Sequence, residues 1–355
     1  MSGLIWKQAA AGFAVCAALL MPAKTAEADP ILGAGSTFAF PMIASWSEGL
    51  QIDRAGGTDY VPNDAGVDYE PVGSVGGMMR LAQPQVDFAA TDAPLPPAEL
   101  EARNLAQFPI VVGGLAVVVN LPGVESGQMQ MPRAVLADMY LGRITRWSDA
   151  ALAAANPGLT LPDLPVNVVA RLDGSGSTMT FTQYLARSSA DWAAAHGADT
   201  RIDWPAGISV KGSGKIVQAV QTTPGAIGYV EYGQATRAGL TTVAVENAAG
   251  AFIAPSPEAF AQTARQASWA EEQGFYLHLT GIDAADAYPI TTATFALMRK
   301  GDTASRTLRT LYFFNYALER GADRARGLGY VPLPKTLVAQ VQNSWRKTLP
   351  GAEGF

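Results

Sequence analysis

The amino-acid sequence predicts an α/β protein with largely parallel sheets and more than one domain. Apolar runs rich in β-branched residues alternate with segments whose apolar residues recur every three to four positions, which is typical of α/β folds. The chain has 355 residues, more than one hydrophobic core usually serves. Two domains are therefore expected, with ligands bound in loops beyond the carboxyl ends of the strands.

Buried strands are expected where short apolar runs stand between turn residues. These runs lie at residues 86–90, 111–119, 166–169, 227–230 and 295–298. Helical periodicity occupies the segments between them. The last two helical patterns, at residues 308–319 and 337–345, are interpreted as structural packing.

The first 28 residues have the features of a secretory signal peptide. Lys7 precedes an apolar stretch at residues 9–21, and Ala26-Glu27-Ala28 matches the A-x-A pattern of a cleavage site. The apolar stretch is shorter than the roughly 20 residues that a membrane-spanning helix needs. Cleavage after Ala28 is expected, and it would also remove Cys16, the only cysteine.

Charge and histidine content exclude two classes of function. The net charge is −6, and loss of the signal peptide would remove two positive charges and one negative charge, which brings it to −7. Proteins that bind nucleic acids usually have a basic surface, so this negative charge argues against a nucleic-acid partner. His196 and His278 are the only histidines and have no ligand-like neighbours, so no metal site is expected.

Three turns rich in glycine and serine each lead into a helical pattern. They are Gly33-Ala34-Gly35-Ser36-Thr37-Phe38, Gly73-Ser74-Val75-Gly76-Gly77 and Asp173-Gly174-Ser175-Gly176-Ser177. Backbone N–H groups at helix starts, with hydroxyls nearby, suit an anion. One such turn is explained by ordinary N-cap preference, whereas three in one secreted chain favour an oxyanion site.

Additional polar residues near these turns allow two interpretations each. Arg171 could clamp two oxyanion oxygens while Asp173 orients it, or it could form a surface ion pair of little energetic value. Asp92 could be a turn residue or a ligand group. A fourth turn, Gly212-Ser213-Gly214-Lys215, is interpreted as a structural helix start, because Ile216 stands where a Walker A loop requires serine or threonine.

The ordered sequence blocks resemble the family of periplasmic phosphate-binding proteins. The blocks are GAGSTFAFP from Gly33, GSVGG from Gly73, VDFAATDAPL from Val86, FPIVVGGLAVVVNLPG from Phe108, YLGRITRW from Tyr140, RLDGSGST from Arg171 and PGAIGYVEY from Pro224. The resemblance implies a type II periplasmic binding protein with two α/β lobes joined by a two-segment hinge. Lobe I would comprise residues 29–116 and 291–355, lobe II residues 117–290, and the chain would cross near residues 115–118 and 289–292.

The resemblance also implies a function and a set of ligand residues. The protein would bind inorganic phosphate between its lobes, without cofactor, metal or catalysis, and deliver it in the periplasm, as a monomer, to the permease subunits of an ABC importer. Asp92 would accept the proton of HPO₄²⁻ or H₂PO₄⁻, which sulfate lacks. The phosphate-binding residues carried over from the family are Thr37, Phe38 through its backbone N–H, Ser74, Asp92, Arg171, Ser175, Gly176 and Ser177.

Three positions depart from the family pattern, and three different functions remain open. Ser177 stands where threonine is common, Val75 where a small residue is common, and Ala170 where another arginine often occurs. A secreted phosphatase would need a general base or metals, and neither histidine lies in the three turns. A receptor for sulfate, molybdate or a phosphorylated metabolite could use the same helix starts. A module that uses the fold for protein contact is the third possibility.

Overall fold

The computed structural model describes residues 30–55, 66–282 and 284–355. The expected signal peptide and its cleavage site lie outside these residues. Over the described ranges, the helices are all too short or too polar to cross a membrane.

Strands and helices alternate along most of the chain. The strands are β1 (Ile31–Gly35), β2 (Val67–Glu70), β3 (Phe88–Thr91), β4 (Leu105–Val119), β5 (Gln130–Met131), β6 (Asn167–Arg171), β7 (Ile208–Val210), β8 (Ala226–Glu231), β9 (Thr241–Thr242), β10 (Ala244–Glu246), β11 (Phe252–Ile253) and β12 (Thr291–Arg299). The α-helices are α1 (Phe40–Ala55), α2 (Ser74–Leu81), α3 (Pro97–Ala102), α4 (Arg133–Tyr140), α5 (Ala150–Ala155), α6 (Gly176–Ser188), α7 (Ala190–Ala195), α8 (Ser213–Thr222), α9 (Tyr232–Arg237), α10 (Pro257–Arg265), α11 (Ala304–Arg320), α12 (Ala322–Gly327) and α13 (Lys335–Thr348). Two short 3₁₀ helices, η1 (Glu271–Gln273) and η2 (Ala352–Gly354), complete the described part of the chain.

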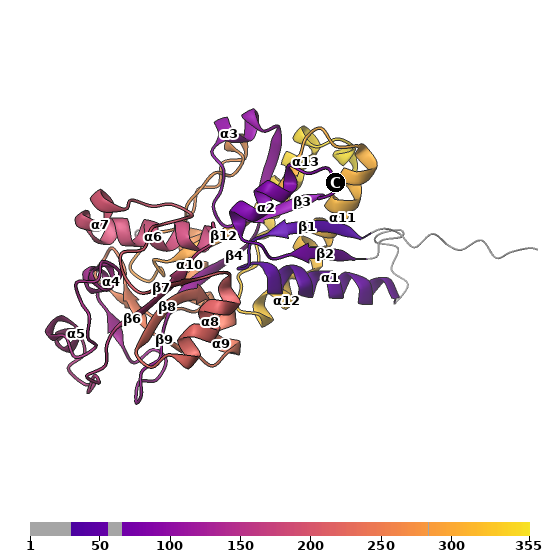
Figure 1. Cartoon of the computed structure of the whole chain (residues 1–355). Coiled ribbons are helices and arrows are strands. Elements are labelled where there is room, and N and C mark those ends of the chain that lie inside the picture. Colours follow the sequence, from indigo (N-terminus) through magenta and orange to yellow (C-terminus); the bar gives the residue numbers. More distant parts are fainter. Residues whose placement is uncertain (1–29, 56–65, 283) are drawn as a thin grey trace, which may run out of the picture.

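The long strand β4 runs through both lobes of the molecule. In the order β2-β1-β3-β12-β4-β8-β6-β7, it pairs with β12 up to Gly114 and with β8 from Leu115 onward. The returning chain lies beside it, because the Leu115 N–H donates to the carbonyl of Ile290 at 2.9 Å. Figure 1 shows β4 and β12 passing between the two bodies, so these two segments form the hinge.

The sheets are less parallel than the sequence predicts. Strands β1, β2 and β3 pair in parallel, as do β6, β7 and β8. Strand β12 is antiparallel to both of its neighbours, and β4 is antiparallel to β8. The difference arises at the hinge, where the strand that leaves lobe I and the strand that returns to it run in opposite directions.

Each predicted strand is present, and the largest extension is in β4. The runs at 86–90, 111–119, 166–169, 227–230 and 295–298 correspond to β3, β4, β6, β8 and β12. Strand β4 begins six residues earlier than expected, since Gln107 and Pro109 obscure its pattern. Its ladder with β12 shifts register between Thr294 and Phe295, opposite Pro109, and such a bulge accommodates a proline that cannot donate to the ladder.

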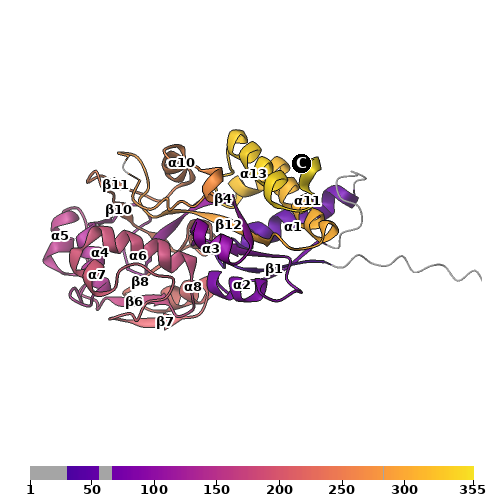
Figure 2. The same cartoon turned by 90° about the horizontal axis from the view of Figure 1, so that it is seen from above.

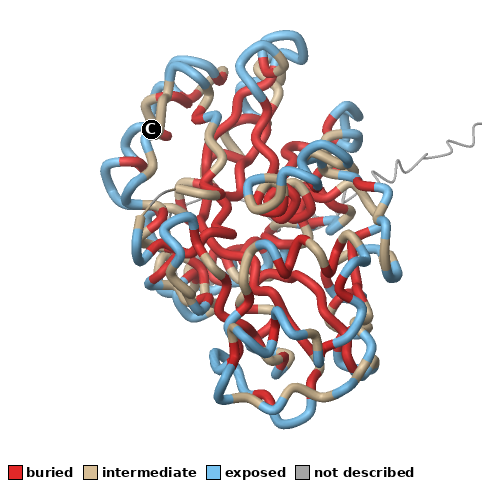
Figure 3. Tube along the Cα trace, turned by 90° about the vertical axis from the view of Figure 1, so that its left-hand side faces the viewer, coloured by how far each residue is buried: buried red, intermediate tan, exposed pale blue. Residues whose placement is uncertain are grey.

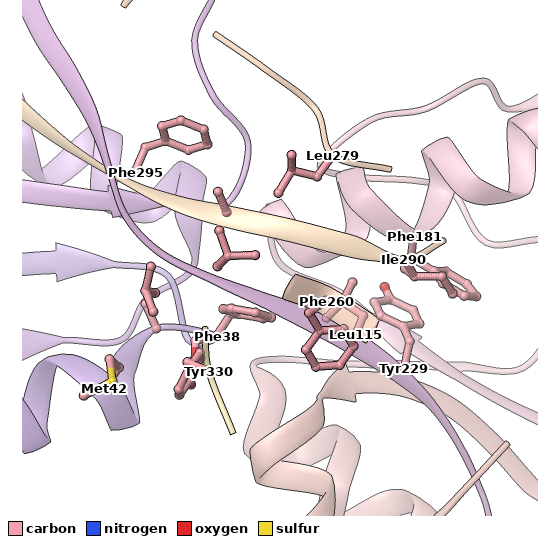
Figure 4. Close-up of a cluster of buried hydrophobic side chains, with 14 of the residues drawn as sticks. Phe38, Met42, Leu115, Phe181, Tyr229, Phe260, Leu279, Ile290, Phe295 and Tyr330 are labelled. Carbon is pink, nitrogen blue, oxygen red and sulfur yellow. The ribbon is translucent and has the colours of Figure 1, made fainter. Parts of the chain in front are cut away.

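Helices cover both faces of the strands, and the buried interior continues through the hinge. Figure 2 shows α1, α11 and α13 on one side of lobe I and α2 on the other. Figure 3 shows the buried residues in the interior of the chain trace and the exposed residues along its outside. The apolar side chains drawn in Figure 4 run from Phe38 past Leu115 to Tyr229, from one lobe to the other.

Candidate functional site

The three predicted glycine- and serine-rich turns meet between the lobes. The turns before α1 and at the start of α2 belong to lobe I, and the turn before α6 belongs to lobe II. The Ser74 Oγ accepts a hydrogen bond from the Gly176 N–H at 3.0 Å. The Val75 N–H donates to the carbonyl of Gly174 at 3.2 Å. Loops separated by about a hundred residues therefore lie in direct contact.

Ser36 organises the first turn and connects it to Asp92. Its Oγ accepts from the N–H groups of Phe38 and Ala39, both at 3.1 Å, so it caps the start of α1. The same hydroxyl donates to the Asp92 carboxylate, at 2.8 Å from Oδ1 and 2.7 Å from Oδ2. The carbonyl of Phe38 accepts from the Tyr330 hydroxyl at 2.6 Å. The first turn is therefore fixed by Asp92 through Ser36 and by Tyr330 through the Phe38 carbonyl.

Asp92 is a buried carboxylate that follows β3 directly. It is only 2% exposed, and its own N–H donates to Ser74 Oγ at 3.3 Å. Burial raises the pKa of Asp92 to about 6, although hydrogen bonds from Thr294 and Ser36 and the charge of Arg171 oppose the shift. Asp92 therefore exchanges a proton more readily near neutral pH than an exposed aspartate does.

Two threonines of β12 hold Asp92 from the hinge side. The Thr294 Oγ1 donates to Asp92 Oδ1 at 2.7 Å, and the Thr292 Oγ1 donates to the Asp92 carbonyl at 3.3 Å. Alternate residues of a strand share one face, so both hydroxyls point the same way. The sequence interpretation missed these residues, and the signal was the group of threonines at the start of β12, in which Thr292 and Thr294 stand two positions apart.

In lobe II, Arg171 at the end of β6 forms a bidentate ion pair with Asp173. Its Nε donates to Asp173 Oδ1 at 2.8 Å, and a second guanidinium nitrogen donates to Oδ2. Arg171 is 2% exposed and Asp173 is 10% exposed, so the interpretation as a surface ion pair is excluded. Burial alone would raise the pKa of Asp173, but the Arg171 charge and hydrogen bonds, with the Gly212 N–H, hold it below its usual value.

The third turn begins α6 and supplies three of the predicted residues. Ser175 caps the helix, because its Oγ accepts from the Thr178 N–H at 3.3 Å. Ser177 is buried in the first helical turn. Gly176 has no room for a side chain, since a Cβ there would lie 2.7 Å from both the Asp92 Cβ and the Ser74 Oγ. Close approach of the two lobes requires glycine at this position.

The fourth turn is a helix start, as predicted, and it also lies against the site. Ser213, the first residue of α8, has its Oγ 2.8 Å from the Thr37 Oγ1. A guanidinium nitrogen of Arg171 donates to the same Ser213 oxygen at 3.4 Å. Ile216 argued against a Walker A loop, and the sequence analysis did not predict that the Ser213 hydroxyl lies at the site.

The arrangement combines several hydroxyl and backbone N–H donors with the guanidinium of Arg171 and the buried carboxylate of Asp92. The predicted ligand residues of lobe I are Thr37, Phe38, Ser74 and Asp92, and those of lobe II are Arg171, Ser175, Gly176 and Ser177. Such a set suits a small tetrahedral oxyanion, because hydrogen bonds must replace the water that the anion loses. Across residues 30–55, 66–282 and 284–355, no group of three or more His, Cys, Asp or Glu side chains is placed to hold a metal.

Comparisons with known proteins agree with the fold. A family model described as a PBP superfamily domain matches residues 21–314. The phosphate-binding protein PstS of Xylella fastidiosa strain 9a5c is 40% identical over 325 residues, which are 91% of this chain and 86% of that protein. The phosphate-binding protein PstS of Haemophilus influenzae is 37% identical and covers 91% of this chain and 95% of its own. A crystal structure of a phosphate-binding protein from Stenotrophomonas maltophilia aligns with a TM-score of 0.61 at 20% identity, over 88% of this chain and 92% of its own.

Proposed function

Because the chain belongs to the PBP superfamily, and within it to the family of phosphate-binding proteins, we propose that it is a receptor for inorganic phosphate. It binds the anion between its two lobes and delivers it to an ABC importer, and it catalyses no reaction. The named relatives that support this proposal are phosphate-binding proteins that align over most of both chains.

The observation that carries the proposal is the buried Asp92 carboxylate, which lies near Gly176 and within the electrostatic influence of Arg171, both in the opposite lobe. A carboxylate accepts hydrogen bonds only, so it repels an anion that has no proton to offer. Its Oδ2 accepts from Ser36 alone among the described residues, which leaves an acceptor position for a proton of phosphate. HPO₄²⁻ and H₂PO₄⁻ carry such a proton at neutral pH, whereas sulfate does not.

The remaining predicted ligands complete the proposed phosphate site. Thr37 and Ser74 offer hydroxyls and Phe38 its backbone N–H from lobe I. From lobe II, Arg171 offers its guanidinium, and the start of α6 offers the N–H and hydroxyl groups of Ser175, Gly176 and Ser177. In this arrangement the Ser36 and Ser74 oxygens, which accept the Phe38 and Gly176 N–H groups, give way to phosphate oxygens.

The proposed lobes comprise residues 29–116 with 291–355, and residues 117–290. The change of the β4 partner between Gly114 and Leu115 supports the first boundary. The start of β12 at Thr291 supports the second. Phosphate held by donors from both lobes has a higher affinity for the closed arrangement, so binding shifts the population toward closure.

We propose that the protein acts in the periplasm as a monomer. Its proposed partners are the permease subunits of the importer, which bind the closed form. The pattern of a signal peptide with an A-x-A site at Ala26-Glu27-Ala28 supports export. Closure brings parts of both lobes into one surface, which a permease can distinguish from the open form.

Isothermal titration of the purified, ligand-stripped protein with phosphate and then with sulfate at neutral pH tests the proposal. Tight one-to-one binding of phosphate without a response to sulfate is the expected result. Sulfate or molybdate binding of equal strength would indicate a general oxyanion receptor. Absence of phosphate binding by a folded protein would point to a phosphorylated metabolite or a protein partner, and turnover of a phosphoester would make the protein an enzyme.

A further inference from the structure

A cavity adjoins the candidate site where the two lobes meet. This outer groove has a volume of about 710 Å³ and is lined by both lobes. Lobe I contributes Thr37 and Phe40, and lobe II contributes Ser213 and residues of α8 and α9. Figure 1 shows α8 and α9 close to the start of α1. The groove therefore begins at the Thr37–Ser213 contact that borders the inner site of Asp92 and Arg171.

The lining of the outer groove is strongly cationic. Lys211, Lys215 and Arg237 line it, and none of the described residues that line it is acidic. This composition contrasts with the whole chain, which has 31 acidic and 25 basic residues. A groove lined by one sign of charge concentrates ions of the opposite sign, so it attracts anions even on an acidic protein.

The charge of the two lysines is available to a ligand. The Lys215 Nζ donates to the neutral Gln218 Oε1 at 2.8 Å. Neither Lys211 nor Lys215 forms a salt bridge with a carboxylate of the described chain. Arg237 is less available, because it lies 3.6 Å from the buried Glu231 carboxylate and donates to the Leu328 carbonyl at 3.1 Å.

A contact between two hydroxyl groups, those of Thr37 and Ser213, lies between the outer groove and the inner site. The Thr37 Oγ1 and Ser213 Oγ are 2.8 Å apart and come from opposite lobes. Behind them, Arg171 donates to the same Ser213 oxygen at 3.4 Å. The Gln234 Nε2 donates to the Thr37 carbonyl at 3.1 Å. Separation of the lobes would break the hydroxyl contact and connect the groove with Arg171.

We propose that the outer groove is a second anion-binding site, which captures hydrated inorganic phosphate through Lys211 and Lys215 and passes it to the inner site. This role rests on the proposed phosphate receptor function. The two sites differ in chemistry, because a lysine ammonium is a strongly hydrated point charge, whereas the Arg171 fork is ordered by Asp173. Lysine thus suits transient capture, and the outer groove acts on the association rate constant while it leaves the dissociation rate constant nearly unchanged.

Stopped-flow measurement of phosphate association at low ionic strength tests the proposal. Tryptophan fluorescence can report binding, because the Trp204 indole N–H donates to the Arg171 carbonyl at 3.0 Å. The double variant Lys211→Gln/Lys215→Gln should lower the association rate constant by roughly three- to tenfold. The dissociation rate constant should stay within about twofold of wild type, and the difference in association should disappear at high salt.

A control variant removes two lysine charges at another cavity, where Lys347 pairs with Glu271 at 2.7 Å. Lys300 and Lys347 line a cavity of about 560 Å³ beside α3 and α13. The control Lys300→Gln/Lys347→Gln should associate with phosphate at the wild-type rate. An unchanged association rate in Lys211→Gln/Lys215→Gln, an equal loss in the control, or a change confined to dissociation would each overturn the outer site. A wild-type protein that does not bind phosphate would instead refute the proposed function, and the outer site with it.

Discussion

The Gly176 N–H of lobe II donates to the Ser74 Oγ of lobe I at 3.0 Å. The same Ser74 oxygen accepts from the Asp92 N–H, so one hydroxyl lies between the start of α6 and the buried carboxylate. This contact can form only when the lobes are close, and its geometry depends on the missing side chain of Gly176. A small substitution at this contact should therefore prevent the lobes from closing while each lobe stays folded.

Gly176→Ala should hold the lobes apart without unfolding either one. The added Cβ would lie 2.7 Å from the Asp92 Cβ and 2.8 Å from the Ala93 N, so these backbones must move. Phosphate affinity should fall by roughly ten- to a hundredfold, and small-angle scattering in saturating phosphate should give a larger radius of gyration. Gly158→Ala is the control, because a Cβ there meets nothing within 4 Å. Wild-type affinity in Gly176→Ala would contradict closure at this contact.

Arg171→Lys should weaken phosphate binding although it keeps the positive charge. A lysine cannot donate two parallel hydrogen bonds to Asp173 and reach an oxyanion with a third. Titration calorimetry should show an affinity loss of roughly tenfold or more. Arg146→Lys alters an exposed arginine that pairs with Asp163 at 2.5 Å, and it should leave affinity unchanged. If Arg171→Lys lowered only the melting temperature, Arg171 would be a structural residue.

Asp92→Asn should reduce the discrimination between phosphate and sulfate. An amide can donate a hydrogen bond, so it removes the repulsion that a carboxylate exerts on an anion without a proton. The ratio of phosphate to sulfate affinity should fall by roughly a hundredfold, as measured by competitive titration. Asp138→Asn changes a more exposed aspartate, paired with Arg143, and should preserve the ratio. Unaltered selectivity in Asp92→Asn would show that the filter lies elsewhere.

Glu231 should make the ligand-free protein less stable as the pH rises toward neutrality. Its carboxylate accepts from the N–H groups of Gly233 and Gln234, but burial raises its pKa from 4.5 to about 7. Between pH 4.5 and about 7, the folded state therefore binds more protons than the unfolded state. The stabilisation that protonated Glu231 gives the folded state is complete below pH 4.5 and is lost as the pH rises through about 7.

Urea unfolding of the ligand-free protein at several pH values from about 5 to about 8 measures this effect. In this range the free energy of unfolding of wild type should fall by about 2–3 kcal/mol more than that of Glu231→Gln. Glu101→Gln, an exposed change on α3, should follow the wild-type curve. Parallel curves for wild type and Glu231→Gln would show that Glu231 does not bind this proton.

The local pattern of the sequence was sufficient to predict the α/β class, the main buried strands and the helix starts rich in glycine and serine. Periodicity and capping act over a few residues, so Phe88 to Thr91 and the start of α6 at Gly176 could be recognised without knowledge of their neighbours. The order of the sequence blocks then led to the family and to Asp92 and Arg171. The antiparallel crossing at the hinge was not visible, because pairing depends on where a distant strand returns.

Only the tertiary structure decided which polar groups face one another. Ser36, Thr294 and Ser213 lie far from Asp92 or Arg171 in sequence, and each hydroxyl is ordinary in its own segment. Burial, too, is a property of the assembled lobes: it raises the pKa of Asp92 to about 6 and makes the Arg171–Asp173 pair an internal one. Sequence therefore determined the elements and their likeness to a family, while the folded chain determined the charges and hydrogen bonds, because these depend on distances through space.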